Sequence, residues 1–288
     1  MRRYLLAGMG MVVLSASLAS PGIAKDPKEV SVVKKFETAW NSQNLDEVMR
    51  FFTEDAVVKV LPAPPEGGVY TGKEAIRKWV EEQIPGFHIE TQHHEVSGNR
   101  VSLMGKITSE FFRKMGVIPV ISTVEAVVEK DKIKTLTPIL SQETVGKLVV
   151  RRFIEDFNRG RDLEEIKKEF FTPDFKIHFP GSTTPLDIED YKQFGAMFRS
   201  AFPDLLHTIE TQVAEGERVV THLTISGSHK GIFQGIPPTG KVVNMGEITI
   251  DRIVDGKIAE RWVQFDQMGM MQQLGAIPQP GKQIKGKR

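Results

Sequence analysis

The sequence contains no cysteine. This absence excludes disulfides, a thiol nucleophile, thiolate zinc sites, iron–sulfur clusters and lipid attachment to a cysteine. The sequence also lacks a nucleophile elbow of the type Gly-x-Ser-x-Gly, a phosphate-binding loop and a dinucleotide fingerprint, so serine hydrolases, kinases and dehydrogenases have no local support. His93 and His94 are adjacent and would point to opposite sides of a strand. With no metal-ligand spacing elsewhere, no metal site is predicted.

The chain also lacks a large net charge of either sign. The chain has 38 Lys and Arg against 37 Asp and Glu. Residues 1–24 hold two arginines and no acidic residue, so 36 basic and 37 acidic residues remain without them. Nucleic acid is therefore not an expected partner, because it would require a basic face. Residues 279–288 combine Lys, Arg, Gly, Pro and Gln and are predicted to be a disordered basic tail.

Long apolar runs are limited to the N-terminus. The chain opens with Arg2 and Arg3, continues apolar from Tyr4 to Leu18, and reaches small residues near Ala24. This order is typical of a secretory signal peptide, predicted over residues 1–24. A membrane anchor is the alternative, but the run is short and is broken by glycines and serines. We expect a periplasmic or secreted protein that does not stay inserted in a membrane.

The remaining sequence repeats itself. Val32-Val33-x-x-Phe36-x-x-x-Trp40 and Val149-x-x-x-Phe153-x-x-x-Phe157 both have helical spacing, and each is followed by Asn. Asn44 and Asp162 then each precede a Glu by three residues, as in a capping box. Further matches, among them Ile-Glu-Thr-Gln at 89–92 and 209–212, keep an offset of 117 to 120. Such a constant offset predicts two homologous domains, over residues 26–145 and 146–278.

Both repeats have the same order of elements. Two helices precede a short strand (56–61 and 175–179), a third helix (73–82 and 188–198) and several longer strands. Gly98-Asn99, Glu215-Gly216 and Asp255-Gly256 mark the turns. Helices followed by a run of strands indicate an α+β fold. The simplest packing curls the antiparallel sheet around three N-terminal helices and leaves a pocket between them.

The second repeat carries more specific motifs. These are Phe-Asn-Arg-Gly at 157–160, Ala-Phe-Pro-Asp-Leu at 201–205, Gly-Ile-Pro-Pro-Thr-Gly at 235–240 and Gln-Gln-Leu-Gly at 272–275. In this order they resemble the SnoaL-like polyketide cyclase, or ester cyclase, family of the cone-shaped nuclear transport factor 2-like superfamily. The resemblance covers nearly all of 147–277. The first repeat resembles a divergent member of the same superfamily. The resemblance implies a tandem of two cone-shaped domains.

The resemblance also implies a chemistry. Cyclases of this family close a ring by intramolecular aldol condensation, with an aspartate as general acid/base and no cofactor. Asp266 matches that aspartate. The family's partner histidine has no counterpart, because residues 247–252 contain no His. Cone folds of this kind commonly pair through the outer sheet face, so we expect an intramolecular pseudo-dimer or a weak homodimer.

Asp266 is the leading candidate from the residues alone. Alternation along a strand places Glu260, Trp262, Gln264 and Asp266 on one face. If this face lines the pocket, the indole of Trp262 would raise the pKa of Asp266 and suit it to proton transfer next to a carbonyl. Asp266 also directly precedes a short helical stretch and could instead be its N-cap. In the first repeat Ser141 stands at the matching position, which favours chemistry in the second repeat only.

The sequence offers two histidines as further catalytic candidates and several residues for a pocket wall. His178 and His229 are further candidate catalytic residues, although His229 has the strand parity of a core residue. Tyr191 and Phe198 lie at helical spacing and suit a pocket wall or a core; with Trp262, Gln264, Phe233 and Glu247 they complete the predicted substrate-binding set.

Two functions follow. The first is an exported, cofactor-free cyclase or isomerase of a small apolar carbonyl compound that uses Asp266 as acid/base. The alternative is a non-catalytic protein that binds a small apolar molecule in the same cavity. Hydrolysis of an epoxide or lactone is a weaker third, because it needs a second acid that the sequence does not reveal.

Overall fold

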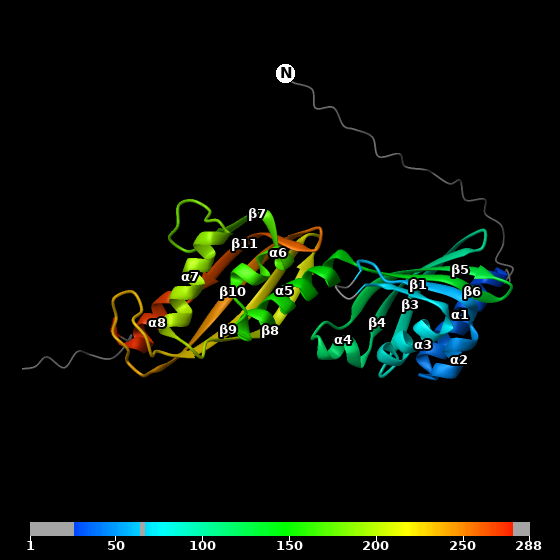
Figure 1. Ribbon diagram of the computed structural model, residues 1–288, viewed down its shortest axis with the longest axis horizontal. Coiled ribbons are helices and arrows are strands. Elements are labelled where there is room, and N and C mark those ends of the chain that lie inside the picture. The colour runs from blue at the N-terminus through cyan, green and yellow to red at the C-terminus, as the bar shows by residue number, and fades with distance from the viewer. Residues whose placement is uncertain (1–25, 64–66, 279–288) are drawn as a thin grey trace, which may run out of the picture.

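A computed structural model describes residues 26–63 and 67–278 and contains two α+β domains in tandem (Figure 1). The first has helices α1 (Lys28–Asn41), α2 (Leu45–Arg50), α3 (Gly72–Gln83) and α4 (Glu110–Lys114), with strands β1 (Phe52–Lys59), β2 (Val69–Thr71), β3 (His88–Ser97), β4 (Arg100–Thr108), β5 (Val120–Glu129) and β6 (Lys132–Leu140). The second has α5 (Gln142–Asn158), α6 (Leu163–Phe170), α7 (Ile188–Ala201) and α8 (Gln267–Leu274), with β7 (Phe171–His178), β8 (Leu206–Glu215), β9 (Arg218–Ser228), β10 (Val242–Val254) and β11 (Lys257–Phe265). The predicted signal peptide and basic tail lie outside the described residues.

The two sheets share one topology. The first has strand order β2-β1-β6-β5-β4-β3 and the second β7-β11-β10-β9-β8. The predicted hairpins join β3 to β4, β8 to β9 and β10 to β11. The strand that follows the second helix pairs in parallel with the last strand, β1 with β6 and β7 with β11, so neither sheet is purely antiparallel.

Three N-terminal helices accompany each sheet, as predicted. Asn44 and Asp162 are N-caps whose side chains accept hydrogen bonds from the backbone N–H groups of Glu47 and Glu164. Capping satisfies amide groups that the first helical turn leaves without partners. Each second helix ends before the second phenylalanine of the repeated pair, because Phe52 and Phe171 already begin strands.

The repeated Ile-Glu-Thr-Gln motif does not follow the structural offset of the long strands. β3 and β8 begin 118 positions apart, at His88 and Leu206. Each strand has an irregularity at the same place, between Thr91 and His93 and between Ile209 and Thr211. The repeated Ile-Glu-Thr-Gln, at an offset of 120, is therefore two residues out of register with the structure. A slip of two keeps the side-chain parity, so both copies still fit their sheets.

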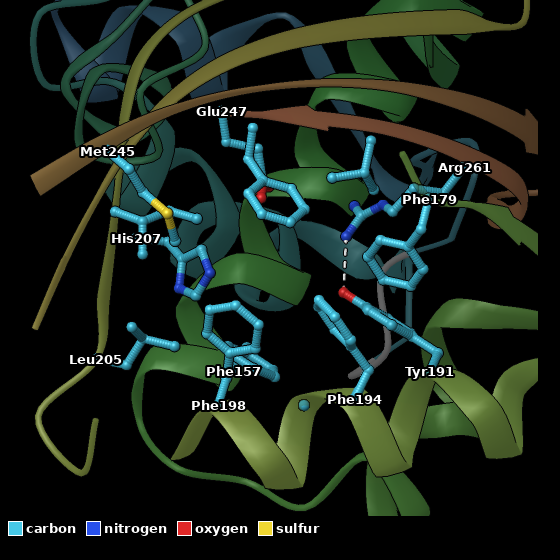
Figure 2. Close-up of a pocket in the computed structure, with 14 residues that line it drawn as sticks. Phe157, Phe179, Tyr191, Phe194, Phe198, Leu205, His207, Met245, Glu247 and Arg261 are labelled. Atoms are coloured by element: carbon cyan, nitrogen blue, oxygen red, sulfur yellow. Dashed lines mark hydrogen bonds between the residues drawn. The ribbon is translucent and has the colours of Figure 1, made fainter. Parts of the chain in front are cut away.

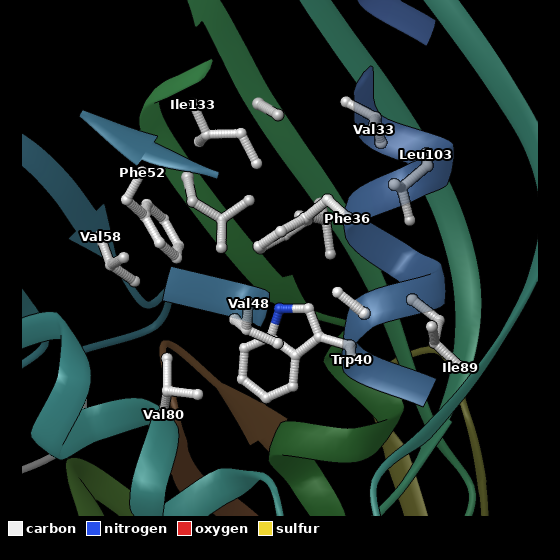
Figure 3. Packing of buried hydrophobic residues seen from close by; sticks show 14 of the residues in the cluster. Val33, Phe36, Trp40, Val48, Phe52, Val58, Val80, Ile89, Leu103 and Ile133 are labelled. Carbon is white, nitrogen blue, oxygen red and sulfur yellow. The ribbon is translucent and has the colours of Figure 1, made fainter. Parts of the chain in front are cut away.

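Each domain has its own apolar core. In the first, α1 contributes Val33, Phe36 and Trp40, which meet Val48 of α2 and Phe52 of β1 (Figure 3). The second domain has two adjacent clusters, one around Phe153 and Phe171 and one around Phe198 and Phe202. Strand β5 alternates buried and half-buried residues along its length, as a strand with one covered face does.

Helix α5 lies between the two domains (Figure 1). Only Gln142 and Glu155 of this helix are exposed. Thr144 Oγ1 accepts a hydrogen bond of 3.3 Å from the backbone N–H of Ile121 in β5. The guanidinium of Arg151 lies against Gly116 in the first domain, where a Cβ would be 2.4 Å from an Arg151 nitrogen. A helix that is buried on nearly all sides has neighbours on both of its faces.

No helix in the described ranges combines the length and the apolar character required to cross a membrane.

Candidate functional site

The second domain encloses a cavity of about 50 Å³ between α5, α7 and the inner face of its sheet (Figure 2). Aromatic side chains from α7 form one wall, and β10 and β11 form the opposite wall. Most lining residues are apolar or aromatic, and the polar ones are His207, Glu247 and Arg261, with the Tyr191 hydroxyl. An apolar cavity with a few convergent polar groups is the usual form of a small-molecule site.

Glu247 on β10 is the carboxyl group of this cavity. Burial raises the pKa of Glu247 to about 7, against the attraction of the Arg261 guanidinium and with a contribution from Asp251. No donor in the described part of the chain hydrogen-bonds this carboxylate, so desolvation decides the shift. A carboxyl group with a pKa near 7 exists in both protonation states at neutral pH. It can therefore accept a proton and return it.

Arg261 on β11 lies on the same face of the sheet as Glu247. It is almost fully buried, with 4% of its surface exposed. Its Nε donates to Asp251 Oδ1 at 2.6 Å, and its Nη1 donates to the Tyr191 hydroxyl at 3.2 Å. Burial opposes its charge, but Asp251, Tyr191 and Glu247 together outweigh burial and raise the pKa of Arg261 above its usual range. Its Nη2 is buried and has no partner in the described chain. A positively charged side chain in the cavity wall that has an unpaired N–H donor can bind an oxygen atom of a substrate.

His207 at the start of β8 is the third polar group. Burial lowers the pKa of His207 to about 4, and the positive charges of Arg261 and Arg199 lower it further. Asn158 Oδ1 accepts from the His207 backbone N–H at 2.9 Å, and Asn158 Nδ2 donates to the His207 carbonyl at 2.8 Å. This pair fixes the amide, so Oδ1 faces His207 Nδ1 at 3.3 Å. Nδ1 then carries the ring proton, and Nε2 of the neutral imidazole is a hydrogen-bond acceptor.

The prediction that Trp262 and Asp266 face the cavity is wrong. The opposite face of β11, with Arg261, Val263 and Phe265, lines the cavity. Asp266 is exposed, and its carboxylate accepts from the Gly269 backbone N–H at 2.8 Å as the N-cap of α8. Ser141 caps α5 in the same way. The two matching positions therefore share one structural role, and Asp266 does not line the cavity enclosed by the second domain.

His178, Trp262 and Glu260 form a cluster on the outer face of the second sheet. The His178 ring stacks on Trp262 with centroids 4.9 Å apart, and its Nε2 lies 2.9 Å from a carboxylate oxygen of Glu260. Gln264 is exposed on the same outer face. These side chains lie outside the cavity because the helices cover the other face of the sheet.

His229 and Phe233 belong to the core instead of the cavity wall. Both are fully buried. His229 Nδ1 accepts from the backbone N–H of Thr239 at 3.2 Å, and its ring stacks on Phe202 with centroids 5.2 Å apart. Phe233 packs edge to face on Phe198. Thr239 of the Pro-Pro-Thr-Gly loop contacts the His229 ring, which does not line the cavity.

Three predicted residues do line the cavity: Tyr191, Phe198 and Glu247. Arg261 and His207 are the polar lining residues that sequence reasoning missed. The turn at 255–256 alone would set Asp251 opposite Glu260, and a register shift between Arg252 and Ile253 brings Asp251 opposite Arg261. Because local patterns do not reveal such a bulge, neither the Asp251–Arg261 pair nor His207 could be found from the sequence. Within the described residues, no cluster of three or more His, Asp or Glu has a geometry that fits a metal ion.

Comparison with known proteins explains the repeat. The model of the SnoaL-like polyketide cyclase family matches residues 148–274, and a SnoaL-like domain model matches residues 33–134. Aklanonic acid methyl ester cyclase DnrD of Streptomyces peucetius is 33% identical over 131 residues, which are 44% of this chain and 88% of that enzyme. The chain belongs to the SnoaL-like polyketide cyclase family. Nogalonic acid methyl ester cyclase of Streptomyces nogalater is 30% identical over 129 residues, 42% of this chain and 91% of that enzyme. The solved structure of TsrD from Streptomyces laurentii is 28% identical, covers 46% of this chain and 96% of that one, and has a TM-score of 0.41.

The two SnoaL-like domains differ in their interiors. The second holds the polar groups described above in a small cavity. The first SnoaL-like domain has a cavity of about 660 Å³. Its lining is dominated by aromatic and aliphatic side chains. The duplicated fold therefore supports two different sites in one chain.

Proposed function

We propose that the second SnoaL-like domain catalyses proton transfer next to a carbonyl group, leading to ring closure or isomerisation of an apolar carbonyl compound. The observation that carries this proposal is Glu247, a carboxyl group whose pKa burial raises to about 7, in one cavity with the unpartnered Nη2 of Arg261. The curated relatives that match this domain are cyclases of methyl esters. Their reaction class agrees with this pair of groups.

The proposed reaction needs no redox partner. The Glu247 carboxylate takes a proton from the carbon next to a carbonyl, and the electron pair moves to the carbonyl oxygen. The Arg261 Nη2–H group stabilises the resulting enolate. The enolate carbon then bonds to a second carbonyl carbon of the same molecule, and the new alkoxide takes the proton from Glu247. The neutral His207 Nε2 accepts a hydrogen bond from a hydroxyl of the substrate.

Substrate entry requires the aromatic wall to move. Ligand sites for small molecules enclose about 300–1,000 Å³, whereas this cavity encloses about 50 Å³. Phe194 and Phe198 of α7 close the cavity on the side opposite the sheet (Figure 2). We propose that these two rings rotate outward when substrate binds. Replacing Phe194 with Ala should then lower KM for a bulky substrate more than it changes kcat.

A first test does not require the natural substrate. A simple carbonyl compound is incubated with the protein in heavy water, and deuterium uptake next to the carbonyl is followed by NMR. The wild type should accelerate uptake, and Glu247→Gln should abolish the acceleration. Glu260→Gln is the matched control, because Glu260 lies on the outer face of the neighbouring strand. Equal acceleration by Glu247→Gln and wild type would refute Glu247 as the base.

A second test uses methyl esters of the kind named for the relatives. Intramolecular ring closure without loss of water gives a product of unchanged mass and new chromatographic mobility. Tight binding of such a compound without any conversion, and without deuterium uptake, would instead support the non-catalytic alternative.

Export and weak self-association remain part of the proposal. Mass spectrometry of the protein from the periplasm or medium should show a chain that lacks about residues 1–24. Ile248 and Val213 are exposed on the outer sheet face of the second domain, which suits a weak homodimer through that face. Light scattering that shows a stable tetramer would contradict this.

A further inference from the structure

The cavity of the first domain is large enough for a ligand. It encloses about 660 Å³, within the range of roughly 300–1,000 Å³ typical of small-molecule sites. Trp40 lines the cavity and contacts Trp79 and Phe87 at centroid distances of 5.7 and 4.5 Å. Tyr70 continues this aromatic wall at 5.8 Å from Trp79. An apolar space of this size bordered by rings favours a ring-containing ligand.

Helix α5 closes this cavity from the second domain. Val145, Leu148, Val149 and Arg152 follow the helical spacing i, i+3, i+4 and i+7 and all line the cavity. The neighbouring stripe of Val150, Phe153, Ile154 and Phe157 belongs to the core of the second domain. The stripe that faces the first domain is thus held in place by the packing of the second. The first cavity is complete only in the tandem chain.

The charges around the cavity select against anions. Among the described lining residues, the acidic ones are Glu37, Glu82, Glu169 and Asp255, and the only basic one is Arg152. Arg152 is paired with Glu169 at 2.5 Å, and Glu37 accepts from Thr91 and contacts His94 Nε2 at 2.7 Å. The hydroxyl of Ser122, which also lines the cavity, donates to the Ile139 carbonyl. No cation is left to neutralise an acidic ligand, whose buried charge would be costly.

We propose that the first domain is a binding site for an apolar, ring-containing molecule without negative charge, enclosed between the first sheet and helix α5. This site is separate from the Glu247 cavity and does not depend on the proposed reaction. It gives the first domain a function of its own.

Two dyes with one ring skeleton test the charge rule. N-phenyl-1-naphthylamine is uncharged, and its sulfonate derivative, anilinonaphthalene sulfonate, is an anion. We expect the uncharged dye to bind about tenfold more tightly or better, a difference of about 1.4 kcal/mol. Equal binding of both dyes, or tighter binding of the sulfonate, would overturn the proposal, as would the absence of binding by the uncharged dye.

The tryptophans locate the bound dye. The chain has three, and Trp262→Phe leaves only Trp40 and Trp79, both in the first cavity. Trp262 itself lies on the outer face of the second sheet. In the Trp262→Phe protein, the uncharged dye should quench tryptophan emission strongly by energy transfer. Dye fluorescence that rises without quenching of these two tryptophans would place the dye elsewhere and refute the site.

A filled cavity supplies the control for position. Ala126 is buried in β5 and lines the cavity, so Ala126→Phe should weaken dye binding about tenfold or more. Ala276→Phe makes the same substitution at an exposed residue after α8 and should leave binding unchanged. If circular dichroism shows that Ala126→Phe does not fold, the Trp262→Phe measurement decides. Unchanged dye binding by folded Ala126→Phe overturns the proposal. Weaker dye binding by Ala126→Phe, together with unchanged binding by Ala276→Phe, supports it.

Discussion

Replacing Glu247 with Gln is expected to stabilise the protein at alkaline pH while it removes the proposed activity. In the folded chain the pKa of Glu247 is raised from its ordinary value of 4.5 to about 7. Between these values the folded state keeps a proton that the unfolded state has lost. The free energy of unfolding therefore falls as the pH rises from about 4.5 to about 7.

The size of this loss follows from the two pKa values. Ionising Glu247 inside the cavity costs about 3 kcal/mol relative to the unfolded chain, since each pKa unit corresponds to about 1.4 kcal/mol. Glutamine resembles the protonated acid in shape and carries no charge. Above about pH 8, Glu247→Gln should thus unfold with a free energy about 3 kcal/mol higher than the wild type. Below pH 4.5 the two proteins should be equally stable.

The assay is urea unfolding of both proteins at pH 8.5 and at pH 4.5, followed by circular dichroism. In thermal unfolding at pH 8.5, the same gain in stability corresponds to a rise in Tm of roughly 10 °C for a domain of this size. Glu260→Gln is again the matched control, because that carboxylate is partly exposed and paired with His178 and Arg252. A stability difference that is the same at both pH values, or a loss of stability at pH 8.5, would show that folding does not raise the pKa of Glu247.

Three further predictions follow from the same geometry. Burial lowers the pKa of His207 to about 4, so stability should fall as the pH drops from 6.5 towards 4; His207→Asn should remove this fall in a Tm series, and an unchanged fall would contradict it. Asp251→Ala leaves the buried Arg261 without its carboxylate and should cost about 3–5 kcal/mol in urea unfolding, so a loss below 1 kcal/mol would argue against a buried pair. Asp266→Ala should cost about 1 kcal/mol as a lost N-cap. Asp266→Asn should keep both stability and turnover, and a large loss of turnover in this variant would restore Asp266 as a catalytic candidate.

Much of the fold was predictable from the sequence. The repeat offset, the helical spacing of Phe36 and Trp40, and the Gly-containing turns each report local rules that do not depend on distant residues. Asn44 and Asp162 are N-caps as predicted, because capping involves only neighbouring backbone groups, although neither forms the reciprocal capping box. The family could be recognised for the same reason, since its motifs are contiguous.

The candidate site was only partly predictable. Strand alternation correctly separates Arg261 and Phe265 from Trp262 and Asp266, since parity is a local property. Which face lines the cavity depends on where α5 and α7 pack, and these helices are distant in sequence. A tryptophan on the exposed face and an arginine on the covered face also contradict the usual hydrophobic preference. The buried Asp251 compensates for the Arg261 charge and allows this arrangement.

Residues close together in the chain were enough to predict a tandem of two α+β domains, because they set the helix periods, turns and caps. That Glu247, Arg261 and His207 share one cavity follows only from the packing of the chain, because β8, β10 and β11 bring them together from three separate strands. Tertiary packing also decided that α5 closes the larger cavity of the first domain, since a helix with two apolar stripes does not reveal which domain covers each.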